Sequence, residues 1–261
     1  MIELLIFVFV GMFVGLSAGL LGIGGGLVSV PLMIFLLPFF NVSAAVIMHM
    51  AIATSLALII PTSVISAYSH WRHNAIEWPV VVIFLPGLLV GGGVGAYVAL
   101  YMQREMLQMV FAVFLFAIAL YMLRAKSSIA TAHSVKRQAK AVSSPFLPTV
   151  MMGAISSLMG VGGGTMIVPY LLWRGVNLPK AIGSSAACGL PIAISGSLFF
   201  FLLKDGDENM IYWPAFVGIL VGVIVFTPMG AKLALQLNVV LLKRFFIAML
   251  VIVSLKLFFS N

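Results

Sequence analysis

A glycine-rich motif with a following proline occurs twice in this chain. Residues 22–26 read Gly-Ile-Gly-Gly-Gly and precede Pro31, and residues 160–164 read Gly-Val-Gly-Gly-Gly and precede Pro169 at the same spacing. Each motif lies inside a strongly apolar segment. Backbone that leaves its helix at membrane depth is tolerated only where protein or a water-filled cavity covers it. The two motifs therefore limit how the chain can pack.

The composition indicates a membrane protein. Of the 261 residues, 63% are hydrophobic and only 8% are charged, whereas about a quarter of the residues of a soluble domain are charged. Several apolar runs reach the roughly 18 to 20 residues that cross a bilayer core of about 30 Å. The loops between these runs are too short for a soluble domain, so we expect the function to be built inside the lipid bilayer.

Composition also excludes several kinds of site. Cys188 is the only cysteine, which excludes an intrachain disulfide, a multi-cysteine zinc site and an iron–sulfur cluster. We expect no metal and no cofactor. The net charge of +8 lies in loops between spans, where orientation in the membrane explains it better than nucleic-acid binding. Residues 1–3 lack the basic region of a signal peptide, so the first apolar run is expected to stay in the mature protein.

The similarity between the two halves extends beyond the glycines. Thr54-Ser55 followed by Pro61 corresponds to Ser184-Ser185 followed by Pro191, at the same internal spacing. Further matches follow in the same order: Trp78-Pro79, Gly87, Gly95, Leu107 and Phe111 correspond to Trp213-Pro214, Gly222, Gly230, Leu242 and Phe246. We predict two homologous transmembrane repeats, 1–124 and 145–261, joined by the linker 125–144.

Each repeat is predicted to contain one glycine-broken segment and three plain spans, in an all-α polytopic membrane fold. The broken segments cover residues 2–37 and 145–173. Residues 2–21 alone are long enough to span, so two passes and a dip that returns both stay open for 2–37. The plain spans are predicted at 44–68, 78–101 and 105–123, and at 181–203, 212–231 and 241–259.

The distribution of charge favours inverted repeats. The linker 125–144 is basic and has no acidic residue, so we place it in the cytoplasm. Parallel repeats would divide the 14 Lys and Arg residues 8 inside to 6 outside, whereas inverted repeats divide them 11 to 3. We predict a multi-pass protein of the bacterial inner membrane with both termini in the periplasm.

The glycine breaks are the candidate substrate site. A helix that restarts after a break presents unpaired N–H groups and a partial positive charge, which together can bind an anion. Two inverted breaks near the midplane would favour a small anion without a buried Lys or Arg. The alternative is that the glycines only allow close helix packing. The candidate residues are Gly24, Gly25, Gly26, Gly162, Gly163, Gly164 and Thr165.

Polar residues follow the breaks. The hydroxyl pairs Thr54-Ser55 and Ser184-Ser185 could donate to an anion, although Ser and Thr in membranes often bond to their own or a neighbouring helix. His49 lies within the span predicted at 44–68, near its outer end. Because ionisable groups inside membranes are functional candidates by default, His49 is a candidate for proton coupling.

These features resemble the sulfite exporter TauE/SafE family of membrane permeases. The resemblance covers essentially the whole chain and depends on the repeated glycine break with its proline, the hydroxyl-bearing span and the basic central linker. It implies transport of sulfur-containing anions such as sulfite or organosulfonates across the bacterial inner membrane. It also implies that the glycines of both motifs line a central site. The common Gly-Thr-Ser of the family reads Ala-Thr-Ser at 53–55 and Gly-Ser-Ser at 183–185, and both keep a hydroxyl pair.

We therefore expect a secondary transporter, acting as an exporter by alternating access. An enzyme is not expected, because the carboxylates are terminal or in loops and the histidines are scattered. The alternatives are a channel or permease for another small anion, and a membrane accessory subunit that does not transport. The sequence leaves open the exact substrate, the direction, the coupling ion (proton, sodium or none) and the oligomeric state.

Overall fold

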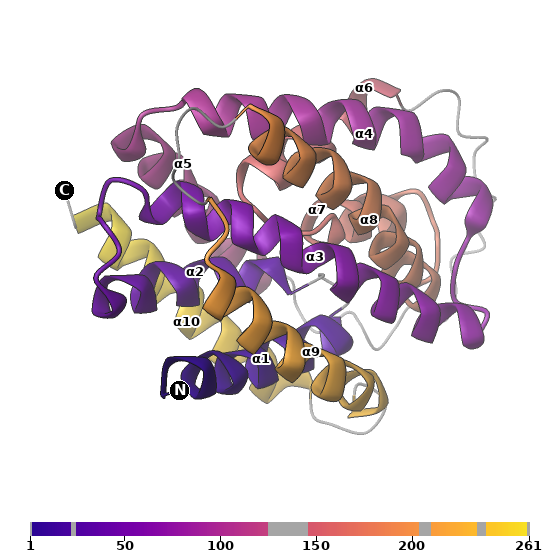
Figure 1. Ribbon diagram of the computed structural model, residues 1–261. Coiled ribbons are helices and arrows are strands. Elements are labelled where there is room, and N and C mark those ends of the chain that lie inside the picture. The colour runs from indigo at the N-terminus through magenta and orange to yellow at the C-terminus, as the bar shows by residue number, and fades with distance from the viewer. Residues whose placement is uncertain (1, 22–24, 125–145, 204–209, 234–238, 260–261) are drawn as a thin grey trace.

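The computed structural model describes residues 2–21, 25–124, 146–203, 210–233 and 239–259, and every regular element in these ranges is helical. Figure 1 shows their arrangement. The elements are α1 (Ile2–Leu21), α2 (Gly26–Leu36), the short 3-10 helix η1 (Leu37–Phe40), α3 (Ile47–Arg72), α4 (Trp78–Tyr101), α5 (Arg104–Arg124), α6 (Phe146–Leu158), α7 (Gly164–Trp173), α8 (Leu178–Leu202), α9 (Trp213–Leu233) and α10 (Val239–Phe259).

The predicted all-α polytopic membrane fold is confirmed. Within the described ranges, six helices are long and apolar enough to cross a bilayer, namely α1, α3, α4, α5, α8 and α9. Each of the six predicted plain spans corresponds to one helix, and α4 has the predicted bounds. The helix α2 has 11 residues and α7 has 10, which gives each a length of about 15 Å at 1.5 Å per residue. Each can reach only about halfway across the core.

The starts of the long helices follow local sequence signals. Pro79 occupies the first turn of α4, where its missing N–H costs no hydrogen bond. Asn177 precedes α8, and its side chain accepts a hydrogen bond from the backbone N–H of Lys180 at 3.1 Å. Such a cap satisfies one of the free donors at a helix start. The cap at Asn177 explains why α8 starts at Leu178, three residues before the predicted start at 181.

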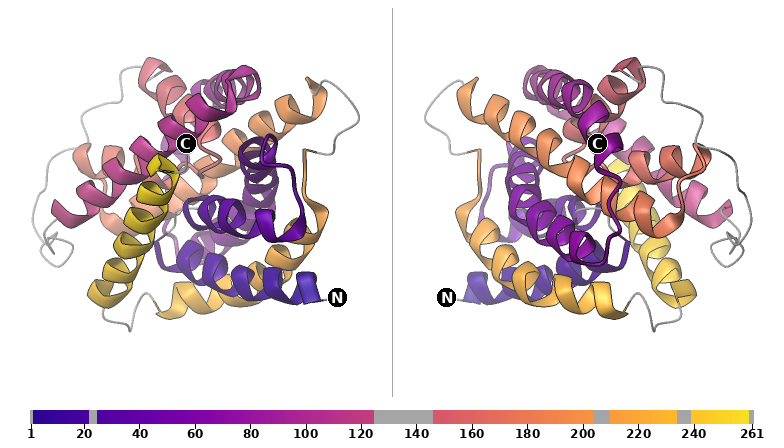
Figure 2. Two further views of the ribbon diagram at one scale, coloured as in Figure 1. Left: turned by 90° about the vertical axis from the view of Figure 1, so that its left-hand side faces the viewer. Right: turned by 90° about the vertical axis from the view of Figure 1, so that its right-hand side faces the viewer.

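Helices from opposite halves of the chain pack against each other. The most extensive pairings join α1 to α9, α4 to α6 and to α8, α3 to α8, and α5 to α10. Figure 1 shows α3 and α8 side by side near the middle of the molecule, and Figure 2 gives two further views of the bundle. The short helices lie on the long ones, α2 on α3 and α7 on α8. Two hydrophobic clusters result among the described residues, and each contains residues of both halves.

Glycines allow two of these pairings to be very close. A Cβ built on Gly222 of α9 would lie 2.5 Å from the carbonyl carbon of Gly11 in α1. A Cβ built on Gly91 of α4 would lie 2.1 Å from the carbonyl oxygen of Val150 in α6. Helix backbones in membranes approach in this way where small residues meet. The close-packing role of glycine is therefore present in this fold, away from the two glycine motifs.

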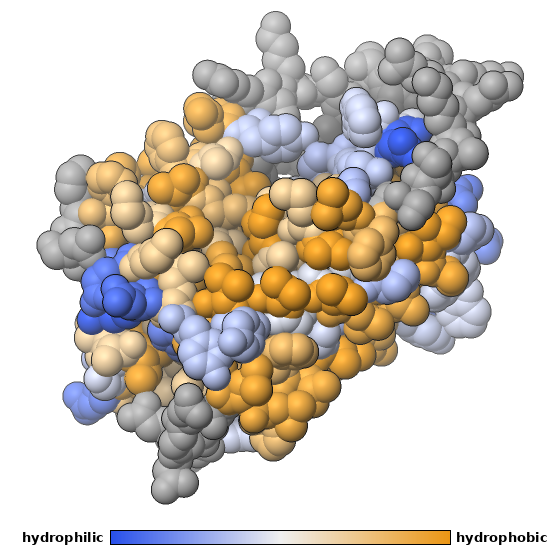
Figure 3. Space-filling view, turned by 90° about the horizontal axis from the view of Figure 1, so that it is seen from above, coloured by the Kyte–Doolittle hydropathy of each residue, from blue (hydrophilic) through white to orange (hydrophobic). Residues whose placement is uncertain are grey.

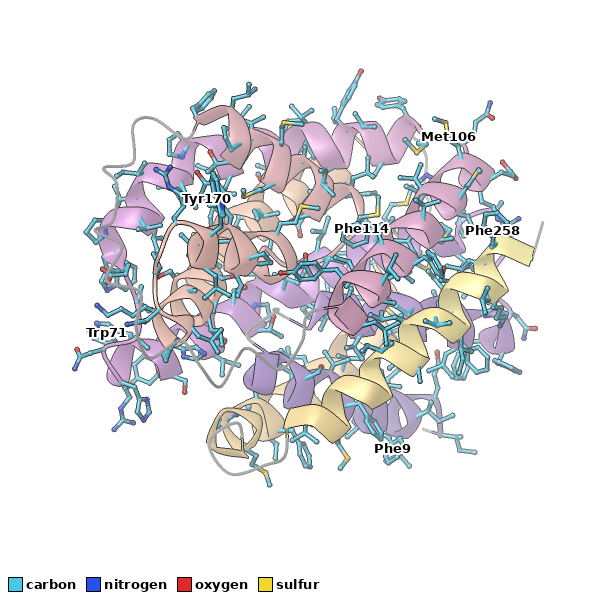
Figure 4. The ribbon with its side chains drawn as sticks, turned by 180° about the vertical axis from the view of Figure 1, so that it is seen from behind. Phe9, Trp71, Met106, Phe114, Tyr170 and Phe258 are labelled. Atoms are coloured by element: carbon cyan, nitrogen blue, oxygen red, sulfur yellow. The ribbon has the colours of Figure 1, made fainter. Side chains whose placement is uncertain are left out.

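The outer surface is apolar. Figure 3 shows hydrophobic side chains over most of the described part of the face seen from above, with hydrophilic residues mainly towards its edges. Figure 4 shows Phe9, Met106 and Phe258 pointing away from the helices, and each is more than half exposed. Such a large exposed apolar surface requires lipid around it. The protein is therefore a multi-pass membrane protein.

Candidate functional site

The first glycine motif interrupts a helix. α1 ends at Leu21 and α2 begins at Gly26. Gly25 precedes α2 with φ 78°, in the left-handed region that favours glycine. Its carbonyl accepts the first hydrogen bonds of α2, from the N–H groups of Val28 and Ser29. Gly25 and Gly26 are both buried, whereas Gly24 lies outside the described residues.

The second glycine motif also interrupts a helix. Gly160 has φ 62°, and its N–H donates to the carbonyl of Ser157 at 3.0 Å, which closes the end of α6. α7 then begins at Gly164. The residues between, including Gly162 and Gly163, are buried and not helical. A helix end and a helix start therefore both lie inside the protein at this motif.

The two breaks touch each other. A Cβ built on Gly26 would lie 2.5 Å from the carbonyl oxygen of Gly160 and 2.9 Å from the Cα of Val161. This is contact between backbone and backbone, which only a residue without a Cβ permits. The start of α2 therefore lies directly against the second break, although Gly26 and Gly160 are 134 positions apart in the chain.

Ser55 holds the two breaks together. Its side chain is fully buried, and its hydroxyl donates to the carbonyl of Gly160 at 2.7 Å. The same hydroxyl lies 2.8 Å from the hydroxyl of Ser29 in α2. One side chain of α3 thus connects the first turn of α2 to the break between α6 and α7. In contrast, the hydroxyl of Ser185 is buried and has no partner among the described residues.

Thr54 and Ser184 bind backbone N–H groups from the opposite half of the chain. The N–H of Tyr212, just before α9, donates to the Thr54 hydroxyl at 2.9 Å. The N–H of Glu77, just before α4, donates to the Ser184 hydroxyl at 2.8 Å. Both hydroxyl-bearing side chains are fully buried. Each residue therefore anchors the start of a long helix.

The surroundings of these two anchors differ. The carboxylate of Glu77 forms an ion pair with the Lys180 ammonium, with Oε1 and Nζ 2.6 Å apart. The Tyr212 hydroxyl donates to the Glu3 carboxylate, and burial together with this bond raises the pKa of Tyr212. Beside Tyr212 an open cavity of about 420 Å³ is lined by Val42, Ser43, Val46, Met50, Ile211, Tyr212, Trp213 and Pro214.

Comparison with known proteins identifies the family. The family model described as "Sulfite exporter TauE/SafE" matches residues 7–257. The chain belongs to the TauE/SafE family. It is 34% identical over 263 residues to a "Probable membrane transporter protein" of Haemophilus influenzae, and the match covers 98% of each chain. The sequence resemblance to this family is thereby confirmed.

More distant relatives carry similar names. A "Probable membrane transporter protein" of Methanocaldococcus jannaschii is 29% identical over 237 residues, which cover 88% of this chain and 85% of the relative. The corresponding protein YunE of Bacillus subtilis is 27% identical over 230 residues, covering 82% and 84%. No solved structure matches this chain significantly. The TauE/SafE chain is a membrane transporter, and its relatives are named as transporters rather than enzymes.

His49 of this TauE/SafE protein lies in the first turn of α3 and is half-buried. Its Nε2 lies 3.2 Å from the carbonyl oxygen of Met102, which follows α4. The imidazole therefore connects the start of α3 to the turn between α4 and α5. The proposal that it couples protons stays a prediction.

Other functional groups of this TauE/SafE chain were not predicted from the sequence. Ser63 of α3 is buried without a partner in the described part of the chain and faces Gly189 of α8. It follows Ser55 by eight residues in the same helix, which places the two on one face. This spacing could have identified it. The Glu77–Lys180 ion pair joins residues 103 apart in the chain, and no local pattern indicates it.

No enzyme-like metal cluster is formed within the described ranges, where no three His, Cys, Asp or Glu side chains come together. Cys188 is buried as a free thiol. Among the residues whose burial the structure describes, the buried polar side chains are Ser, Thr and one Gln. What the centre of the protein offers a solute is therefore hydroxyl and backbone groups.

Proposed function

We propose that this transporter exports a small sulfur-containing anion, such as sulfite or an organosulfonate, by alternating access around the contact between the two glycine breaks. The observation that carries the proposal is the close approach of Gly26 to Gly160, which brings both broken helices to one buried place. Interrupted helices that meet inside a membrane protein are typical of transporter binding sites. The family description supports sulfite as the first solute to test.

The helix starts at the breaks favour a negative charge. In α2 the N–H groups of Val28 and Ser29 bond to Gly25, and in α7 the N–H groups of Met166 and Ile167 bond to Gly163 at 3.3 and 2.8 Å. The N–H groups before these have no partner within their helices. With the partial positive charge of each helix start, they can bind an anion without a cationic side chain.

The helix pairings support two repeats, 1–124 and 145–261, related by a two-fold axis, and the charge distribution favours the inverted arrangement. When each helix is exchanged for the one at the corresponding place in the other repeat, the pair α1–α9 becomes α6–α4. The same exchange turns the bond from Tyr212 to Thr54 into the bond from Glu77 to Ser184. Such exchange is expected of repeats related by a two-fold axis.

The two anchors provide the ends that alternating access would open and close. The end at Tyr212 borders the open cavity of about 420 Å³. The end at Glu77 carries the additional ion pair to Lys180. We assign the first end to the periplasm and the second to the cytoplasm, following the charge distribution and the cytoplasmic placement of 125–144. In this assignment the open cavity faces the periplasm.

Transport of labelled sulfite and of labelled sulfoacetate into proteoliposomes tests the proposal. Purified full-length protein should give saturable uptake that protein-free liposomes lack. Uptake that rises linearly with concentration, without saturation, would indicate a channel instead of a carrier. Absence of any protein-dependent flux for both anions would favour the accessory-subunit alternative.

A further inference from the structure

The two breaks are lined by different residue types at corresponding positions. The spacing of 130 residues that relates Ser55 to Ser185 also relates Ile59 to Gly189 and Ser63 to Ala193. Ile59 and Gly189 lie beside opposite breaks, since Ile59 is next to Gly26 and Gly189 is next to Gly163. The second residue of the short helix is Leu27 in α2 and Thr165 in α7. The second break therefore has glycine and hydroxyls where the first has apolar side chains.

The first break is filled by apolar side chains. The Cδ1 of Ile59 lies 3.0 Å from the position that a Cβ on Gly26 would occupy. Leu27 is 1% exposed, and the hydroxyls of Ser29 and Ser55 are already hydrogen-bonded. Little remains at the start of α2 that could donate a hydrogen bond from a side chain.

A buried hydroxyl lies beside the second break. A Cβ built on Gly189 would lie 2.7 Å from the hydroxyl of Ser63 and 3.9 Å from the backbone nitrogen of Gly163, beside the start of α7. Ser185 lies one helical turn before Gly189 and therefore on the same face of α8. Thr165 is in the first turn of α7. The start of α7 therefore has Ser63 of α3 beside it, and Thr165 and Ser185 are the further hydroxyls of its own first turn and of this face of α8.

These hydroxyls are unsatisfied although they are buried. Ser63 and Ser185 are each 1% exposed, and neither they nor the Thr165 hydroxyl has a hydrogen-bond partner within the described residues. Buried polar groups are usually paired, so each exception requires an explanation. A bound solute that supplies acceptor atoms is one such explanation.

Three carbonyls near the second break already accept hydrogen bonds. The carbonyl of Gly160 accepts from Ser55, that of Ser156 accepts from Val161, and that of Gly163 accepts from Ile167. The hydroxyls of Ser63, Thr165 and Ser185 donate to none of the described residues. A hydroxyl without an acceptor can donate to the oxygen of an anion. Donors from three helices suit a solute with several acceptor oxygens.

We infer that the solute is a small oxyanion bound at the start of α7 alone, by the hydroxyls of Ser63, Thr165 and Ser185 and the first N–H groups of that helix. The first break then packs against the site without binding the solute. Ser55 holds it in place, and Ile59 fills it. This inference rests on the proposed function and replaces a symmetric site with a one-sided one. Gly189 keeps open the space beside Ser63.

Binding of labelled sulfite to the purified full-length protein in detergent, measured by equilibrium dialysis, tests the inference. Ser63→Ala and Ser185→Ala should each raise the Kd about tenfold, because each removes a hydrogen bond to a charged solute. Gly189→Ala should weaken binding as well, since its methyl would lie 2.7 Å from the Ser63 hydroxyl. An excess of chloride should compete poorly with sulfite.

Ser195→Ala is the matched control. Ser195 is a buried serine of the same helix α8, and its hydroxyl donates to the carbonyl of Pro191 in that helix at 3.0 Å. This variant should bind sulfite within about twofold of the wild type, since its hydroxyl is already satisfied. Elution as a single size-exclusion peak and an unchanged Tm would show that the Ser63 and Ser185 variants are folded.

The outcomes separate this inference from the proposed function. Wild-type affinity in folded Ser63→Ala and Ser185→Ala proteins would overturn the one-sided site while leaving sulfite transport intact. Equal competition by chloride would overturn the oxyanion assignment. Wild-type protein that binds sulfite but gives no flux would contradict transport and support the site. Wild-type protein that neither binds nor moves sulfite would overturn both.

Discussion

The hydroxyl of Ser55 in α3 donates to the carbonyl oxygen of Gly160 at the end of α6, at a distance of 2.7 Å. The two residues are 105 apart in the chain. A carbonyl at a helix end has lost its partner within the helix, so this bond satisfies an acceptor that would otherwise be buried without one. The second glycine break is thus stabilised by a side chain from the other half of the protein.

Ser55→Ala should therefore destabilise the protein. It leaves the Gly160 carbonyl without this donor and leaves the Ser29 hydroxyl only its longer 3.5 Å bond to the Gly26 carbonyl, and a buried unsatisfied group costs about 1–3 kcal/mol. The Tm in detergent should fall clearly. Ser17→Ala is the control, because Ser17 is also buried but bonds only to Val14 within α1. An equal Tm for the two variants would mean that the Ser55 bond does not stabilise the break.

Gly26→Ala should abolish flux and lower the Tm. Its methyl would lie 2.5 Å from the Gly160 carbonyl oxygen and 2.9 Å from the Val161 Cα, and backbone atoms cannot move aside without displacing the break. Gly93→Ala is the control, because its methyl would meet only the ring of Phe199, 2.7 Å away, which can rotate. Normal flux in Gly26→Ala protein would show that the breaks do not need to touch.

The Glu77–Lys180 ion pair should affect conformation more than stability. The side chains are 34% and 40% exposed, so Glu77→Gln should change the unfolding free energy by only about 0–1 kcal/mol. If the pair holds the cytoplasmic end closed, this variant should speed labelling of a cysteine at Ile182 from that side, in a Cys188→Ala background. The exchange Glu77→Lys with Lys180→Glu should restore slow labelling. The same labelling rate in the parent protein, in Glu77→Gln and in the charge-exchanged protein would rule out a gate at this pair.

Inverted repeats predict the sidedness of two loops. Single cysteines at His133 and at Gly206, each in a Cys188→Ala background, should react with a membrane-impermeant maleimide on opposite faces of the membrane. His133 should react only in inside-out vesicles and Gly206 only in intact spheroplasts. Reaction of both positions on the same face would support parallel repeats. A cytoplasmic marker protein with an exposed cysteine controls for leakage. The maleimide should label it in burst cells and not in intact spheroplasts.

Proton coupling through His49 predicts a specific phenotype for His49→Gln. The amide can keep a hydrogen bond to the Met102 carbonyl, but it does not titrate between pH 5 and 8. A pH gradient should therefore no longer stimulate sulfite flux, while sulfite–sulfite exchange should continue. The side chain of His49→Asn is shorter and reaches Met102 less well. Comparison of the Asn and Gln variants therefore separates loss of the hydrogen bond from loss of the titratable group. Full stimulation by a pH gradient in the Gln variant would exclude His49 as the coupling group.

Local patterns predicted much of the architecture. The bounds of α4 match the prediction, and both helices break at the glycine motifs, because hydropathy and the backbone freedom of glycine act over a few residues. The sequence also identified the hydroxyl pairs at 54–55 and 184–185 as candidate site residues. Their partners were not identified, because Thr54 binds the N–H of a residue 158 positions away and Ser184 one 107 positions away.

The sequence by itself determined that this chain crosses a membrane, where its helices begin, and where two of them break, since each of these depends on neighbouring residues. Only the tertiary structure decided that Gly26 touches Gly160, that Ser55 is already bonded, and that Ser63 and Ser185 are not. The physical reason is that a hydroxyl can bond to its own helix, to another backbone or to a solute. Which of these it does depends on the helices packed around it.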